Sequence, residues 1–253
     1  LATQSLPINA ALRTDLPFDV DKDFQAVSVL VHVPFVLVVN PDVPVGNVGE
    51  LVALAKKEPG KLNFAHIGTG TPHFLAMEWF KQTAGIDIVG IPYKGVAPGM
   101  AAVSAGEAQL SLTGLTAGMA QVKAGKLKAL AVATAKRNSA APELPTIAES
   151  GYPDFSFDAW YGLFLPAKTP RAIVDRFNAA VRHAITSAEV KARFAAAGGR
   201  KPVVIVASAA RRVSFTKGLL RCRGYFAMAP GVESLNVAVA GAIALYEWRR
   251  QNT

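Results

Sequence analysis

The sequence predicts an α/β fold, in which strands alternate with helices along the chain. Apolar segments of strand length, such as Leu62–Ile67 and Leu127–Thr134, lie next to segments that carry helix caps. The connections are short and the strand segments are continuously apolar, which is typical of a parallel sheet buried on both faces. A chain of 253 residues can hold two lobes or one large domain.

The composition indicates a folded protein with a substantial core. Hydrophobic residues make up 51% of the chain, and the mean hydropathy is +0.27. The longest apolar run, Val27–Val39, is too short and too interrupted to span a bilayer. The single cysteine, Cys222, excludes an intrachain disulfide and any multi-cysteine metal site. No signal peptide is recognisable, and because Leu1 is an unusual natural start, we expect a processed product or a fragment.

Charge is distributed unevenly along the chain. Residues 200–253 hold nine basic and two acidic residues, so they carry +7 of the net charge of +9 and leave +2 for the first 199 residues. We therefore expect a nearly neutral body, residues 1–199, followed by an unrelated basic tail, residues 200–253.

The first elements are expected to be extended and then helical. Val27–Asn40 is apolar and β-branched, and Pro34 is predicted to split it into two extended pieces. Asn47 and Glu50 resemble a capping box, which predicts a helix that runs to Gly60.

Strand–helix alternation continues through the middle of the body. Strands are predicted at Ile86–Tyr93, Gln109–Thr113 and Leu127–Thr134, and helices at Pro98–Ala105 and Ala117–Lys123. Thr169 is a predicted N-cap, and a shorter helix is expected to follow from Ser187. The helix that Thr169 begins is expected to bury an apolar stripe formed by Ile173, Val174, Phe177, Val181 and Ile185.

A glycine-rich turn links the strand Leu62–Ile67 to a helix that is predicted to run to about Thr83. Gly68 and Gly70 allow a sharp turn, Thr71 is a plausible N-cap, and Pro72 would take the first helical position. A strand, a glycine turn and a helix start leave several amide N–H groups directed at one spot, where the helix dipole favours an anion. This pattern predicts a site for a small anion, such as a carboxylate.

Other interpretations of the same turn stay open. A dinucleotide fingerprint would need a third glycine where His73 stands, and a phosphate loop would need Gly-Lys-Ser/Thr. The turn could also bind no ligand, and His73 could be a solvated or capping residue. Tyr93–Gly95 and Thr113–Leu115 follow neighbouring strands, however, and the carboxyl ends of parallel strands share one edge of a sheet.

Five motifs of the body occur in the order of a known family. They are Gly68–His73, Tyr93–Gly95, Ala124–Lys126, Leu144–Gly151 and Trp160–Pro170. Together they resemble the TctC/Bug-type solute receptors of tripartite tricarboxylate transporters, over about residues 1–199.

The resemblance implies a periplasmic-binding-protein-like, two-lobed fold with parallel-rich sheets. Residues 1–39 and 135–199 would form the first lobe and residues 40–134 the second, with hinge strands near Val36–Val39 and Ala129–Ala133. The family's amino-terminal signal peptide, early strands and Pro-Gly-Gly-rich loop are not recognisable here, so the first lobe is expected to be incomplete.

The same resemblance implies a function and a set of ligand-binding residues. The family's receptors are periplasmic, close around a small carboxylate and work with membrane components of a transporter. No catalysis, cofactor or metal is implied, no nucleic acid is expected at residues 1–199, and the chain would be a monomer. The expected ligand-binding residues are those that match the family's ligand loops by position, together with Thr113 at the end of a predicted strand. They are Thr3, Gln4, Ser5, Gly68, Thr69, Gly70, Thr71, His73, Tyr93, Lys94, Gly95, Ala97, Pro98 and Thr113. Tyr93 could instead be a core residue, Lys94 a solvated charge and Trp160 a packing residue.

The tail resembles a different family. Met228–Glu247 is similar to the last motif of SpoU/TrmH-type RNA 2′-O-methyltransferases, whose earlier motifs are not found. A helix is expected at Leu235–Arg249, and a fusion, a frameshift or an assembly error would explain the join near Gly199. The alternative function is therefore a remnant of an S-adenosylmethionine-dependent RNA methyltransferase.

The body itself has no Gly-x-Ser-x-Gly elbow and no His-Glu-x-x-His motif, so its sequence does not indicate a hydrolase of either kind.

Overall fold

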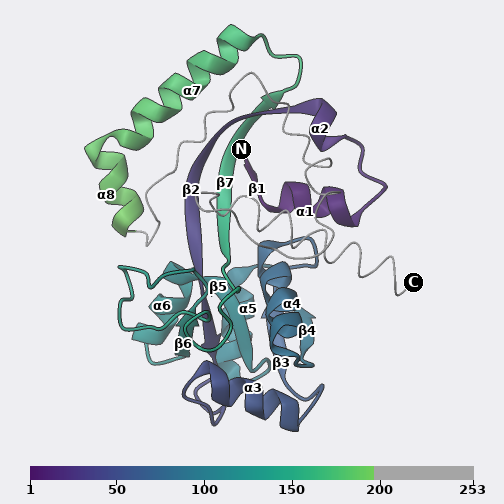
Figure 1. The fold of residues 1–253 in the computed structure, drawn as a ribbon, viewed down its shortest axis with the longest axis vertical. Coiled ribbons are helices and arrows are strands. Elements are labelled where there is room, and N and C mark those ends of the chain that lie inside the picture. Colours follow the sequence, from purple (N-terminus) through teal and green to yellow (C-terminus); the bar gives the residue numbers. More distant parts are fainter. Residues whose placement is uncertain (197–253) are drawn as a thin grey trace. The chain divides into compact units, whose positions relative to one another are not determined.

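A computed structural model describes residues 1–196, which form two compact units (Figure 1). Within the described residues, unit 1 combines Leu1–His32 with residues 159–196, and unit 2 is Val33–Asp158. The predicted lobe boundaries at 39/40 and 134/135 fall inside unit 2, so the assignment of lobes stays a prediction. The predicted helix Leu235–Arg249 and the rest of the basic tail lie outside the described residues.

Unit 1 is built on a small sheet. Its elements are β1 (Ala2–Thr3), α1 (Ser5–Leu12), α2 (Val20–Asp23), the first part of β2 (Phe24–Val39), β7 (Asp158–Pro166), α7 (Arg171–Thr186) and α8 (Ala188–Ala196). β1 pairs antiparallel with β7, which neighbours β2 in the strand order. Asn178 Nδ2 on α7 donates to the Val27 carbonyl on β2 at 2.6 Å, which attaches the helix to the sheet.

Helix α7 differs from its prediction in two respects. It begins at Arg171 with Pro170 as N-cap, because Thr169 is used in a turn where its N–H donates to the Pro166 carbonyl at 2.9 Å. The expected burial is right for Val174 and Ile185 but wrong for Ile173 and Phe177, which are 44% and 45% exposed. Periodicity shows which face a helix can bury, whereas burial also needs another element to cover that face.

Unit 2 is a mixed sheet with helices packed on it. Its strands, in spatial order, are β6 (Lys128–Val132), the second part of β2, β5 (Leu110–Gly114), β3 (Asn63–His66) and β4 (Val89–Pro92). Its helices are α3 (Val48–Lys57), α4 (Pro72–Ala84), α5 (Val96–Ala105) and α6 (Leu115–Lys123). β3 is parallel to β4 and β5, whereas β2 is antiparallel to β5 and β6. The predicted α/β class is confirmed, and the sheet is mixed rather than wholly parallel.

Strand β2 is continuous, so the predicted break at Pro34 is wrong. The strand runs for 16 residues and passes from unit 1 to unit 2 between His32 and Val33. The ladder with β5 begins at Phe35, opposite Gly114, directly after the proline. Pro34 thus precedes the first residues that pair with β5 and β6, so neither of these two ladders needs an N–H donor from it.

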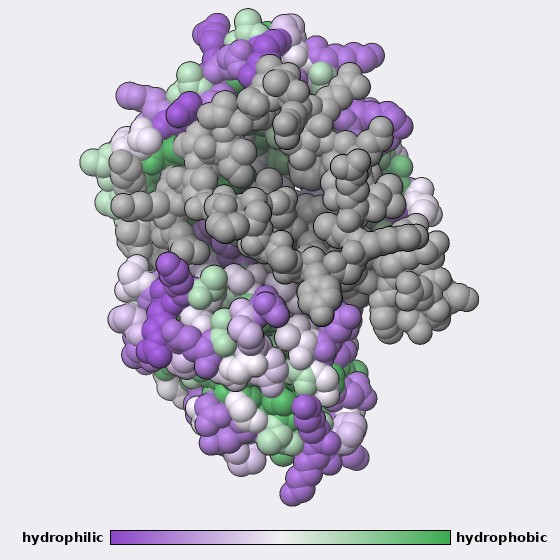
Figure 2. All heavy atoms as spheres, in the orientation of Figure 1, coloured by the Kyte–Doolittle hydropathy of each residue, from purple (hydrophilic) through white to green (hydrophobic). Residues whose placement is uncertain are grey.

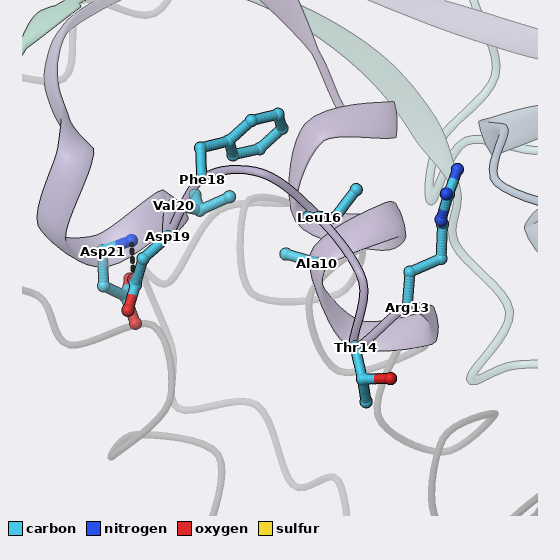
Figure 3. A pocket seen from close by; sticks show the side chains of 8 residues that line it. All are labelled: Ala10, Arg13, Thr14, Leu16, Phe18, Asp19, Val20 and Asp21. Atoms are coloured by element: carbon cyan, nitrogen blue, oxygen red, sulfur yellow. Dashed lines mark hydrogen bonds between the residues drawn. The ribbon is translucent and has the colours of Figure 1, made fainter.

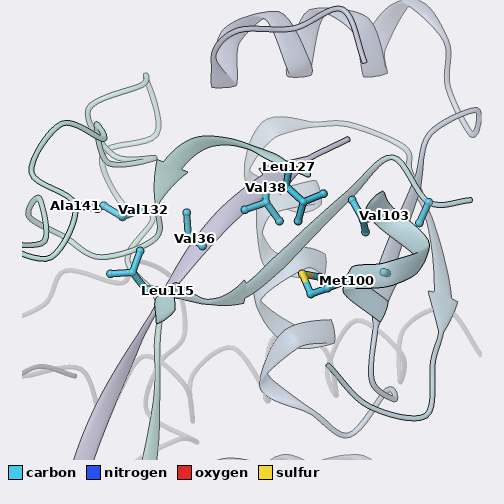
Figure 4. Packing of buried hydrophobic residues seen from close by; sticks show 10 residues of the cluster. Val36, Val38, Met100, Val103, Leu115, Leu127, Val132 and Ala141 are labelled. Atoms are coloured by element: carbon cyan, nitrogen blue, oxygen red, sulfur yellow. The ribbon is translucent and has the colours of Figure 1, made fainter. Parts of the chain in front are cut away.

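The core of unit 2 is a cluster to which β2, α5 and α6 all contribute. Val36 and Val38 on the strand belong to the same buried cluster as Met100 and Val103 of α5 and Leu115 of α6 (Figure 4). On the face seen in Figure 2, hydrophilic side chains are spread over unit 2 with small apolar areas between them. Within residues 1–196, no helix has both the length and the apolar character that a membrane span requires.

Candidate functional site

The glycine turn lies between β3 and α4, as predicted, and it is closed by two bonds to Gly68. Gly68 has φ +121°, a conformation that side-chain-bearing residues rarely adopt. Its N–H donates to Nδ1 of His66 at 3.1 Å, and its carbonyl accepts the Thr71 hydroxyl at 2.6 Å. Thr71 is the N-cap residue of α4, but its side chain accepts no capping bond. The Gly68 amide is therefore committed within the protein, and the first turn of α4 provides the dipole that favours an anion.

His73 lies in the first turn of α4 and is largely enclosed. Its ring centroid is 4.8 Å from that of Phe35, and its Nδ1 is buried without a hydrogen-bond partner among residues 1–196. Burial, with a smaller contribution from His66, lowers the pKa of His73 to about 4. The imidazole is therefore neutral near pH 7, so it can donate one hydrogen bond and accept another, but it supplies no positive charge.

A small cavity in unit 2 brings two of the predicted residues together. It has a volume of about 10 Å³, and its lining includes His73 and Thr113. The lining comes from β3, α4, α5 and β5, and it includes no residue of the loops 68–71 and 93–95, so the convergence of these loops on one site stays a prediction. Thr113 Oγ1 is buried and has no hydrogen-bond partner in the described part of the chain. Two buried polar atoms, His73 Nδ1 and Thr113 Oγ1, thus belong to residues that line one cavity.

The second predicted loop, Tyr93 to Pro98, leads from β4 into α5. Gly95 has φ +132° and is the N-cap of α5, which begins at Val96 rather than at the predicted Pro98. The Tyr93 N–H donates to the His66 carbonyl at 2.8 Å, which joins the two loops. The Tyr93 ring packs against the core cluster of unit 2, and Lys94, Ala97 and Pro98 are exposed.

The three remaining predicted residues lie in unit 1, whereas the other eleven lie in unit 2. Thr3 pairs with Tyr161 in the β1–β7 ladder, and its Oγ1 accepts the Ser5 N–H at 3.2 Å. Gln4 is fully buried at the start of α1. Trp160 on β7 is 4% exposed with its ring beside Phe164, which supports its interpretation as a packing residue.

Unit 1 contains a depression that no sequence pattern indicated. It lies between α1 and α2, has a volume of about 270 Å³, and is lined by Ala10, Arg13, Thr14, Leu16, Phe18, Asp19, Val20 and Asp21 (Figure 3). Arg13 and Asp19, which are charged, interact with neighbouring residues of the chain. Asp19 accepts the N–H groups of Asp21 and Lys22 as the cap of α2, and Arg13 pairs with Asp15. Within residues 1–196, no three His, Cys, Asp or Glu side chains are grouped so that they could hold a metal ion.

Two compact α/β units agree with the two-lobed fold of periplasmic binding proteins, which is also the fold of similar solved structures. The chain belongs to the TctC family, the tripartite tricarboxylate transporter family receptors, whose family model matches residues 2–213. The predicted resemblance is thereby confirmed for the body. Its predicted end at Gly199 is wrong, because the match continues to residue 213.

Individual relatives agree with this assignment. A UPF0065 protein from the tcbD–tcbE intergenic region of Pseudomonas sp. strain P51 is 35% identical over 176 residues, which is 69% of this chain and 52% of the relative. The chain thus spans about half the length of this curated relative.

Solved structures show the same fold. Rpa4515 of R. palustris, solved with adipate, is 31% identical with a TM-score of 0.73, covering 79% of this chain and 68% of the other. MatC from Rhodopseudomonas palustris, solved with bound malate, is 29% identical with a TM-score of 0.72, covering 79% and 69%.

Proposed function

We propose that this chain is a solute-binding receptor that captures a small carboxylate for a tripartite transporter. The observation that carries the proposal is the Gly68–Thr71 turn at the start of α4, in a chain whose relatives include structures with adipate and malate. By the same analogy the receptor would be periplasmic and monomeric, would pass its ligand to membrane components, and would have no catalytic activity.

Recognition in unit 2 would depend on hydrogen bonds and on the dipole of α4. The two candidate loops, residues 68–71 and 93–98, contain no arginine, and Lys94 is their one cationic side chain. Amide N–H groups, the hydroxyls of Thr69 and Thr113, and the neutral His73 are the groups available to a carboxylate. Thr3, Gln4 and Ser5 of unit 1 stay proposed ligand-binding residues by family resemblance.

Calorimetry and thermal-shift screening with adipate, malate and citrate test the proposal. A bound ligand at about 100 times its dissociation constant should raise the free energy of unfolding by roughly 2.7 kcal/mol. Gly70 is outside the set of glycines with positive φ, so Gly70→Val should leave the backbone unstrained and should abolish binding by steric contact. Gly46→Val, in an exposed loop of unit 2, is the control and should bind normally. Equal affinities for wild type and Gly70→Val would remove this loop from the site.

The second candidate function rests on the methyltransferase-like segment Met228–Glu247. This segment lies outside the described residues, and its resemblance stays a prediction. Adding S-adenosylmethionine to the same screen tests it. Stabilisation by S-adenosylmethionine, with no response to any carboxylate, would favour the methyltransferase remnant over the receptor.

A further inference from the structure

His66 occupies a position from which it contacts both candidate loops. It is the last residue of β3 and is 4% exposed. Its Nδ1 accepts the Gly68 N–H at 3.1 Å, and its backbone carbonyl accepts the Tyr93 N–H at 2.8 Å. One residue therefore bonds to loop 68–71 through its side chain and to loop 93–98 through its backbone.

The ring of His66 is held in place on several sides. Its centroid is 4.9 Å from that of Phe74 on α4 and 5.5 Å from that of Phe64 on β3. On β4, a Cβ at Gly90 would lie 3.2 Å from His66 Nε2, so the strand backbone passes close to the ring. A ring confined in this way keeps its acceptor nitrogen aimed at Gly68.

We propose that His66 is a positioning residue that holds loop 68–71 in its binding shape by accepting the Gly68 N–H. On the carbonyl side of Gly68, the Thr71 hydroxyl donates a second hydrogen bond, to the Gly68 oxygen at 2.6 Å. Because Gly68 adopts φ +121°, these two bonds stabilise an unusual backbone conformation. The consequence for ligand affinity rests on the proposed function, whereas the shape of the loop does not.

The bond from Gly68 requires the neutral ring, with its proton on Nε2, because a protonated Nδ1 cannot accept. Burial lowers the pKa of His66 from its ordinary value of 6.5. Two titratable groups interact electrostatically with the His66 ring, Glu78 and His73, and both are on α4. On β4, the residue beside the ring is Gly90, which carries no charge. The bond is therefore present near pH 7 and is lost as the pH falls below 6.5 through the lowered pKa.

Amide hydrogen exchange at Gly68, followed by NMR on the full chain, tests the inference without any ligand. His66→Asn places a non-titrating oxygen near the position of Nδ1, so the Gly68 amide should stay protected. His66→Leu removes the acceptor and should speed exchange about three- to tenfold. His183→Asn, which changes an exposed histidine on α7, is the matched control and should have no effect.

A pH titration gives a second readout that needs no variant to fold. In wild type, the chemical shift of the Gly68 amide should follow the titration of His66, and adipate affinity should weaken over the same range. In His66→Asn the Gly68 amide shift should be flat over this range. Unchanged exchange in His66→Leu, or a Gly68 shift independent of His66 titration, would overturn the inference. If wild type binds no carboxylate while exchange still separates the variants, the proposed function fails and the positioning role stands.

Discussion

Some polar atoms near the glycine turn have hydrogen-bond partners within the protein, and others are buried without one among the described residues. The N–H and carbonyl of Gly68 both have partners, in His66 and Thr71. Thr113 Oγ1, by contrast, is buried without a partner in the described chain, and a buried unsatisfied polar group costs about 1–3 kcal/mol. In a family of receptors, such atoms are candidates for polar contact with the ligand, and they lower the stability of the protein without it.

Thr113→Val should therefore stabilise the protein. The substitution replaces the unpartnered hydroxyl with a methyl group of similar size, so we expect the free energy of unfolding to rise by about 1 kcal/mol. Thr134→Val is the matched control, because the Thr134 hydroxyl donates to the Lys136 carbonyl at 2.7 Å and its loss should destabilise. Urea denaturation of both variants measures the difference. If both lose stability equally, Thr113 Oγ1 has a partner in solution.

The helices of unit 2 are placed by their ends and by one close approach. Asn47 caps α3 by accepting the Glu50 N–H at 2.9 Å, while the Glu50 carboxylate accepts the Gly46 N–H at 2.6 Å. Helix α6 packs on β2 at Gly118, where a Cβ would lie 2.5 Å from Val36 Cγ1. The cap at Asn47 thus determines where α3 begins, and the lack of a side chain at Gly118 allows α6 to approach the sheet closely.

Gly118→Ala should force α6 away from β2. Although alanine has the higher helix propensity, overpacking a dense core typically costs about 1–3 kcal/mol, so we expect a net loss of stability. Shortening the opposing side chain should relieve the clash, so Val36→Ala should cost less in the Gly118→Ala background than in wild type. Thermal and urea denaturation of the double-mutant cycle measure the coupling. Additive losses would show that the helix does not press on Val36.

At the scale of the whole molecule, unit 2 holds a buried apolar cluster formed by its own residues. Every buried member of the cluster centred on Val36 and Val38 lies within residues 33–158. Unit 2 therefore has its own core. Large hydrophobic side chains that are 40–80% exposed occur in both units among the described residues: Leu1, Tyr161, Ile173 and Phe177 in unit 1 and Val89 in unit 2.

Residues 33–158 expressed alone should fold. Because the sheet, its four helices and the buried cluster are all included, we expect one cooperative urea transition with native-like near-UV circular dichroism. Gly118→Ala should shift this transition by the same free energy as in the full chain. A broad, non-cooperative transition would mean that unit 2 depends on the rest of the chain for its packing.

The sequence by itself determined the features that depend on neighbouring residues. The capping of α3 by Asn47 and the start of α4 at Pro72 were predicted, because caps and proline act on the backbone within one turn. The motifs likewise predicted the family, since glycine turns and strand ends recur in a fixed order. Local signals were wrong where a competing local bond existed, as at Thr169, whose N–H closes a turn with Pro166.

Only the tertiary structure decided which distant groups meet. Nothing near His66 in the sequence indicated that its ring would lie beside Gly90 and its Nδ1 would accept from Gly68, or that Gly118 would face Val36. The exposure of Ile173 and Phe177 was equally hidden. Backbone preferences are set by a few adjacent residues, whereas burial, pKa and hydrogen-bond partners depend on which elements the fold brings together.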